Sequence, residues 1–135
     1  MKNVFSVLIL AVMMLAFSAC QNKITLPNIV FKTDTGFVFD NMTVAKGDTI
    51  KVGIIASLAK KGQTLKTFKV SQVLDNNSQT LSTILNETLS AAQASDYSKD
   101  IELIARSQDG TESYTFSVLD AEGLENSISL TITVQ

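Results

Sequence analysis

The stretch that decides the fold is SYTFSVLDAEGLENSISLTITV, residues 113–134. In its first half Tyr114, Phe116 and Val118 occupy every second position, and in its second half Ile, Leu and Val alternate with Ser and Thr. Successive side chains of a strand point to opposite faces, so this alternation predicts two half-buried antiparallel strands. Gly123 lies in the short polar segment between them. The stretch therefore predicts a β-hairpin.

Segments upstream repeat the same alternation, with turn residues between them. Lys-Gly, Asp-Asn-Asn and Asp-Gly sequences mark the turns. We therefore predict an all-β, immunoglobulin-like, two-layer antiparallel β-sandwich of seven or eight strands in a single domain, residues 26–135. The segment NETLSAAQASDY, residues 86–97, fits no strand, and we expect one helical turn or a loop there. The remaining strand segments are 28–32, 37–39 through 42–44, 49–57, 65–74, 81–85 and 100–107.

The alternation also predicts which side chains form the core. Residues of one parity in each strand are apolar and should face the other sheet. The expected core residues are Val52, Ile54, Phe68, Val70, Leu103, Tyr114, Phe116, Val118, Leu130 and Ile132.

The amino-terminal segment predicts export. Residues 4–17 are nearly all apolar, a run too short to cross a bilayer but of the right length for a signal peptide. Ser18-Ala19 precede Cys20, the only cysteine, and this resembles the lipobox of bacterial lipoproteins, in which the cysteine is diacylated. We expect residues 1–19 to be a signal peptide and 20–25 to be a lipidated cysteine with a short tether. The alternative is an ordinary signal peptide with an incidental cysteine.

Composition excludes several functions. The chain has 11 basic and 13 acidic residues, and loss of Lys2 with the signal leaves 10 minus 13, or −3. This balance favours neither nucleic acid nor an anionic membrane surface. Histidine is absent, which removes Ser-His-Asp and Cys-His nucleophiles and the commonest metal ligand. Ser57 and Lys60 match an S-x-x-K string, but its companion motifs are missing. We expect no enzyme activity and no cofactor.

The strand pattern also carries a family resemblance. VFKTDTGFVFDNMTVAKGDTIKVGIIAS (30–57), LKTFKV (65–70) and YTFSVLDAEGLENSISLTITV (114–134) resemble the Ig-like or PKD-like domains of Bacteroidota lipoproteins. This resemblance covers essentially the whole mature chain. It implies an exported adhesive, binding or spacer module, and it transfers no catalytic residues.

Candidate binding residues are few. Sugar sites use aromatic platforms, and Phe31, Phe37, Phe39 and Tyr97 are the aromatic residues that the alternation leaves outside the core. Phe37 and Phe39 share a face, so Phe37, Phe39 and Tyr97 are candidates for ligand binding. Packing at the core or at an edge is the alternative.

The remaining candidate site residues are acidic side chains in loops, as calcium ligands, and one threonine hydroxyl, as a glycosylation site. Asp120 and Glu122, with Asp34 and Asp96 on other loops, are candidate calcium ligands, although no D-x-D-x-D-G run is present. Turn formation is the alternative role for these acids. Thr49 lies in Asp-Thr-Ile, which resembles the sequence at which Bacteroidota O-glycosylate exported proteins.

Together these observations predict a lipid-anchored, non-catalytic binding or assembly module of the cell envelope. The alternatives are a glycan-binding accessory lipoprotein and a structural spacer without ligand. We expect the membrane as a partner through the lipid anchor, an envelope protein or glycan as a further partner, and no nucleic acid. Gln21 rather than Asp follows Cys20, which favours the outer membrane. Residues 21–28 contain no acidic cluster, which favours its periplasmic leaflet, with the cell surface left open.

Overall fold

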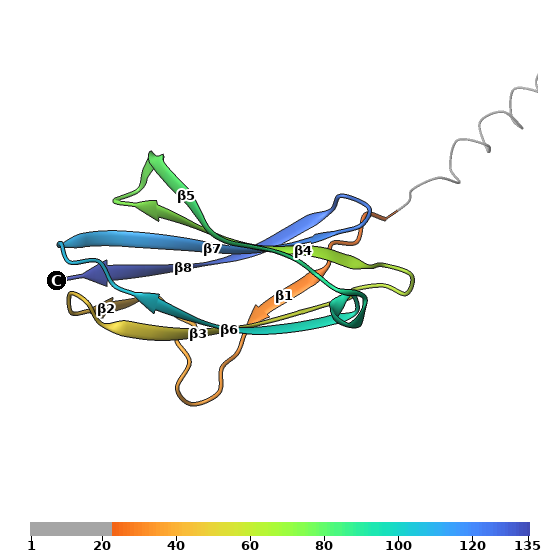
Figure 1. Ribbon diagram of the computed structural model, residues 1–135, viewed down its shortest axis with the longest axis horizontal. Helices are drawn as coiled ribbons and strands as arrows, with labels where there is room; N and C mark the ends of the chain where they lie inside the picture. Colours follow the sequence, from red (N-terminus) through yellow and green to blue (C-terminus); the bar gives the residue numbers. More distant parts are fainter. Residues whose placement is uncertain (1–22) are drawn as a thin grey trace, which may run out of the picture.

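The computed structural model describes residues 23–135, so the predicted signal segment 1–19 and the predicted lipidation of Cys20 lie outside the described residues. Within residues 23–135, no helix is long and apolar enough to span a membrane. These residues form eight strands and one short 3-10 helix (Figure 1). The elements are β1 (Asn28–Phe31), β2 (Met42–Val44), β3 (Thr49–Ser57), β4 (Leu65–Leu74), β5 (Asn77–Thr88), η1 (Ala91–Gln93), β6 (Asp96–Ile104), β7 (Gly110–Asp120) and β8 (Glu125–Val134).

The strands form two sheets that face each other across one core (Figure 1). One sheet has the order β1-β3-β6 and the other β2-β8-β7-β4-β5. All neighbours pair antiparallel except β2, which runs parallel to β8. This arrangement confirms the predicted all-β, immunoglobulin-like sandwich. The hairpin predicted from residues 113–134 is β7–β8, paired from Gly110 with Val134 to Leu119 with Glu125.

The predicted core is confirmed. All ten residues assigned to it by alternation are buried, and Phe116 and Phe68 have no exposed surface. Aromatic contacts join the two sheets: the Phe31 ring meets Phe116 edge-on with centroids 5.6 Å apart, and the rings of Phe68 and Tyr97 lie 5.1 Å apart. Burial of apolar side chains, among which such rings bury the largest areas, is the main source of stability in a domain of this kind.

Residues 37–39, expected to form a strand, lie instead in the loop from β1 to β2, so that expectation is wrong. The chain turns at Asp34, whose carbonyl accepts the Phe37 amide at 3.2 Å, and Gly36 adopts a φ of 97°. The amide of Val38 then bonds to the carbonyl of Lys51 at 2.8 Å. The loop therefore runs beside β3 and bonds to it at Val38 and, directly after β1, at Lys32, whose amide donates to the Gly53 carbonyl.

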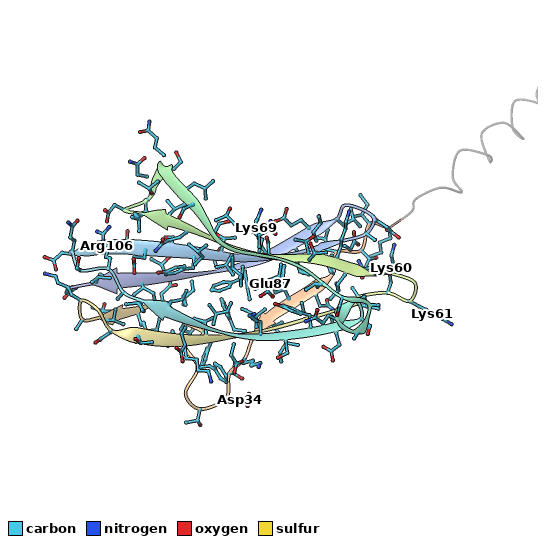
Figure 2. The ribbon with its side chains drawn as sticks, in the orientation of Figure 1. Asp34, Lys60, Lys61, Lys69, Glu87 and Arg106 are labelled. Atoms are coloured by element: carbon cyan, nitrogen blue, oxygen red, sulfur yellow. The ribbon has the colours of Figure 1, made fainter. Side chains whose placement is uncertain are left out.

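Residues 86–97 are only partly the irregular segment that we expected. The expected helical turn is present as η1, closed by Ser90 and Gln93 in a capping box. On either side of it, however, β5 continues to Thr88 and β6 begins at Asp96. Glu87, which Figure 2 shows between the two sheets, lies on the extension of β5 and forms an ion pair of 2.6 Å with Lys99 on the extension of β6.

The end of the sandwich that carries the β4–β5 turn is closed by a salt bridge. Asp75 and Asn76 have φ values of 51° and 56°, as a two-residue hairpin turn of type I′ requires. The Asp75 carboxylate accepts two hydrogen bonds from the Arg106 guanidinium, at 2.7 and 2.8 Å, and one from the Thr111 amide at 2.9 Å. The β4–β5 turn is thereby fixed to the β6–β7 loop.

Candidate functional site

The outer face of the sheet β1-β3-β6, turned away from the core, carries an exposed apolar pair. Val30 of β1 and Ile55 of β3 are directly opposite each other in the sheet register, and their exposed fractions are 54% and 39%. Directly opposed residues of an antiparallel pair lie close enough for their side chains to touch. They form a small apolar strip that the fold leaves uncovered.

Next to this strip lies a group that we call the lysine–phenylalanine cluster: Lys32, Phe37, Lys51 and Asp100. The Phe37 ring is half-buried, with the ammonium groups of Lys32 and Lys51 at 5.4 and 4.9 Å from its centroid. Both distances suit cation–π attraction. The same two ammonium groups bond to the Asp100 carboxylate at 2.6 and 3.3 Å. The ring and the carboxylate therefore hold both lysines on this face.

The missing side chain of Gly53 makes room for the cluster. A Cβ at Gly53 would lie 2.6 to 2.9 Å from three carbons of the Lys32 side chain, closer than any real contact. The Lys32 amide also bonds to the Gly53 carbonyl at 2.8 Å. Because Gly53 has no side chain, the Lys32 stem lies flat over β3 and reaches Asp100.

The charges of the cluster are partly neutralised. The hydrogen bond from Lys32 is the largest cause that lowers the pKa of Asp100 below its ordinary value, and Lys51 acts in the same direction. Two ammonium groups and one carboxylate leave a single net positive charge beside the apolar strip. Such a face can offer hydrogen-bond donors, an acceptor, an aromatic edge and an apolar contact to one ligand.

The sequence candidates Phe37 and Phe39 both lie in the β1–β2 loop. Phe37 belongs to the cluster, and Phe39 has an exposed fraction of 40%. Phe31 is half-buried and packs against Phe116. Of the aromatic residues left outside the core by alternation, Phe37 and Phe39 thus stay available at the surface.

The candidate Tyr97 is not exposed to a ligand, and the alternative of packing in the core holds for it. Its exposed fraction is 2%, and its hydroxyl donates a hydrogen bond to Glu87. Burial is the largest cause that raises the pKa of Tyr97 far above its ordinary value, and the hydrogen bond to Glu87 is the next. Counting back in steps of two from Leu103 reaches Tyr97, so the same alternation would have placed it in the core had β6 been extended to its true start.

The four acidic candidates are not brought together. Glu122 pairs with Lys60 at 3.2 Å. Figure 2 shows that Asp34, in the β1–β2 loop, lies far from Lys60 and therefore from Glu122. Across residues 23–135, no group of three or more His, Cys, Asp or Glu residues could hold a metal ion. Thr49, the candidate for glycosylation, is exposed at the first position of β3, and Asp96 begins β6.

Asp120 has a structural role instead. Its exposed fraction is 1%, and its carboxylate accepts hydrogen bonds from the Gln63 side chain (2.8 Å) and from the amides of Glu122 (2.9 Å) and Leu124 (2.8 Å). Burial alone would raise the pKa of Asp120, but the hydrogen bonds from Leu124, Gln63 and Glu122 outweigh it, and the pKa is lowered. The carboxylate is therefore charged and fully bonded within the β7–β8 turn.

Sequence reasoning missed a second polar group, which we call the tether clamp: Gln63, Asp120 and Asn126. The Gln63 side chain accepts the Ala59 amide at 2.9 Å and donates to Asp120 and to the carbonyl of Thr25 at 3.1 Å. Asn126 donates to the carbonyl of Pro27 at 2.8 Å. The clamp holds residues 25–27 against one end of the sandwich.

No protein-family model matches the sequence, and no curated protein sequence matches it. Solved structures do resemble the fold. A superoxide reductase (neelaredoxin) from Ignicoccus hospitalis gives a TM-score of 0.54 at 8% identity, covering 82% of this chain and 81% of that chain. The CARDB domain of a Pyrococcus furiosus protein, in complex with di-metal ions, gives a TM-score of 0.50 at 13% identity, and the match covers 84% of this chain and 97% of that chain.

A beta-glucosidase from Listeria innocua in complex with gluconolactone gives a TM-score of 0.51 at 10% identity, and 80% of this chain matches only 16% of that chain. At such identities the likeness shows the fold alone. The CARDB domain, whose fold is immunoglobulin-like, agrees with the sandwich described above. Reductase or glucosidase chemistry does not follow from it.

Proposed function

We propose that this chain is an exported, lipid-anchored and non-catalytic binding or assembly module of the bacterial cell envelope. Its anchor would be Cys20, at the outer membrane, and its partner would contact the outer face of β1-β3-β6. The observation that carries the binding role is the exposed pair Val30–Ile55 beside the lysine–phenylalanine cluster. An apolar centre bordered by a polar rim is the usual arrangement of a protein-binding surface, and the cluster would belong to that rim.

The absence of histidine supports the non-catalytic part of the proposal, because the common nucleophile and base systems need it. Turnover of any substrate by the purified protein, without added metal or cofactor, would refute this part.

A glycan-binding accessory lipoprotein is the second candidate, and the exposed Phe39 with the half-buried Phe37 favours it. Their rings lie on one loop, and the Lys32 and Asp100 side chains could exchange hydrogen bonds with sugar hydroxyls. A glycan array separates the two functions. Saturable binding of a glycan that Phe37→Ala abolishes would favour this candidate over a protein partner.

The proposal is tested by an affinity pull-down from the cell envelope. Ile55→Asp and Phe37→Ala should each abolish capture of the partner, because they remove the apolar strip and the ring that orders the lysines. Ser129→Ala, an exposed residue of β8 in the other sheet, is the matched control and should capture the partner as the wild type does. Equal capture by all variants, with unchanged thermal stability, would refute the proposed face.

A further inference from the structure

The unpaired positive charges of the described chain gather at one end. Residues 23–135 contain ten Lys and Arg residues, and seven of them form ion pairs. The three that form none within this part of the chain are Lys23, Lys61 and Lys66. Lys61 follows β3, Lys66 is the second residue of β4, and Lys23 precedes β1, so all three belong to the end held by the tether clamp.

This end is also the one from which the chain leads back towards Cys20. Because Gln63 and Asn126 bond the carbonyls of Thr25 and Pro27, the direction in which the chain leaves the sandwich is set by the fold. Figure 2 shows Lys60 and Lys61 at this end and Arg106 at the opposite end. An anchor at Cys20 would therefore present the lysine-bearing end to the membrane.

Exposed apolar side chains lie in the segment that carries Lys23. Ile24 and Leu26 have exposed fractions of 74% and 44%. A hollow of about 520 Å³ lies here, lined by Lys23, Ile24, Lys60, Glu122 and Leu124. Cationic and apolar groups side by side are the combination that settles at the boundary between lipid headgroups and acyl chains.

The length of the intervening chain agrees with this placement. Three residue steps separate Cys20 from Lys23, which at about 3.3–3.6 Å per residue span at most about 11 Å. The polar layer of one leaflet is about 5–8 Å thick, since about 30 Å of a 40–45 Å bilayer is hydrocarbon. With acyl chains of Cys20 in the hydrocarbon, Lys23 cannot lie far above the lipid phosphates.

We propose that this end of the sandwich docks on the membrane and binds the phosphate groups of anionic phospholipids through Lys23, Lys61 and Lys66. This inference rests on the proposed lipid anchor. At this end Asp96 and the buried Asp120 are the acids that form no ion pair, whereas Asp34 and Asp48 lie in the loops that flank β2. The cations Lys23, Lys60, Lys61 and Lys66 outnumber the acids Asp96, Asp120 and Glu122 here, so an anionic surface favours this orientation over its reverse. Each lysine near such a surface strengthens binding about fivefold, which is enough to orient a domain that an anchor already holds.

The experiment uses the full chain, processed in cells that acylate lipoproteins and reconstituted into vesicles. Acylated Cys20 has no free thiol, so a polarity-sensitive fluorophore can be placed by Ala92→Cys on η1 at the docking end, or by Ser107→Cys at the far end. Emission is compared in phosphatidylcholine vesicles with and without phosphatidylglycerol. Reversal of Lys61 and Lys66 to Glu is compared with the control Lys46→Glu, which changes a lysine remote from the docking end.

We expect phosphatidylglycerol to shift the emission of the Ala92→Cys label and to leave the Ser107→Cys label unchanged. The double reversal at Lys61 and Lys66 should abolish the shift, and Lys46→Glu should retain it. No shift, an equal shift at both labels, or a shift that survives the double reversal would overturn the docking face while leaving the anchor in place. A shift caused by inorganic phosphate in detergent alone would show a soluble-phosphate site and also overturn it. Absence of palmitate on Cys20 would refute both proposals.

Discussion

The Asp120 carboxylate should be among the most costly side chains to remove, although it lies in a turn. It is 1% exposed and accepts three hydrogen bonds, two from backbone amides and one from Gln63. A hydrogen bond to a charged group contributes about 1.5–3 kcal/mol. The turn amides regain some bonds to water after truncation, so Asp120→Ala should lower the free energy of unfolding by about 3–5 kcal/mol rather than the full sum.

Two further variants separate the parts of this loss. Asp120→Asn keeps an oxygen for the two backbone amides but turns an NH₂ group towards that of Gln63, so it should cost about 1–2 kcal/mol. In a double-mutant cycle, Gln63→Ala and Asp120→Ala should be non-additive by about 1–2 kcal/mol, because each removes the same bond. Asp34→Ala, an exposed acid in another loop, is the control and should change stability by less than about 0.5 kcal/mol.

Far-UV circular dichroism during urea unfolding measures these values, and its dependence on pH adds an independent check. The pKa of Asp120 is lowered in the folded state, so its stabilisation is present above the ordinary value of 3.8 and is lost as the pH falls through the lower folded pKa. The difference between wild type and Asp120→Ala should therefore shrink in acid. A loss below about 1 kcal/mol at neutral pH, or a difference that does not depend on pH, would refute this account of the carboxylate.

Phe116→Ala should cost about 3–5 kcal/mol in urea unfolding, because the ring is fully buried between the sheets, and a smaller loss would contradict its central place. Asp75→Ala should speed proteolysis at the β4–β5 turn, and Asp75→Asn should speed it less. Asn tolerates the left-handed backbone conformation, so Asp75→Asn loses only the charge that faces Arg106. Equal cleavage rates for the two variants would contradict this. Glu87→Gln should flatten the fall in melting temperature below about pH 4.5. The hydrogen bond from Lys99 is the largest cause that lowers the pKa of Glu87 in the folded state, and the bond from Tyr97 is the next. An unchanged pH profile would count against this role of Glu87. Cys20→Ala should abolish palmitate labelling, and labelling that persists would disprove the anchor.

Alternation of apolar residues was sufficient to predict the sandwich and its core, because in a strand the parity of a residue determines the face on which it lies. It failed where no such pattern was available. Residues 37–39 alternate over too short a length to distinguish a strand from a loop that follows β3. Alternation did not assign Tyr97 to the core because β6 begins within a segment that looks irregular, just after η1.

The tether clamp and the lysine end could not be predicted at all. Gln63 and Asp120 are 57 positions apart in the sequence and lie in two different turns, so only the packing of the sheets brings them together. The net charge of the sequence, in turn, sums all charged groups and does not say where on the surface they lie. Ion pairs engage seven of the ten cations in residues 23–135, and the three that remain show a local excess that composition conceals.

The parallel pairing of β2 with β8 has a mechanical consequence. Met42 to Val44 pair with Ile132 to Val134, and the Gln135 amide bonds to the Val44 carbonyl at 3.1 Å. The carboxyl-terminal strand ends opposite the clamped end (Figure 1). Tension between an anchor at Cys20 and the end of β8 would load the tether clamp and β1 first, and once these gave way it would pull along β2 and β8 in opposite directions. The hydrogen bonds between them would be loaded in shear and would have to break together rather than one at a time. A protein anchored in this way would resist stretching more strongly than its thermal stability alone suggests.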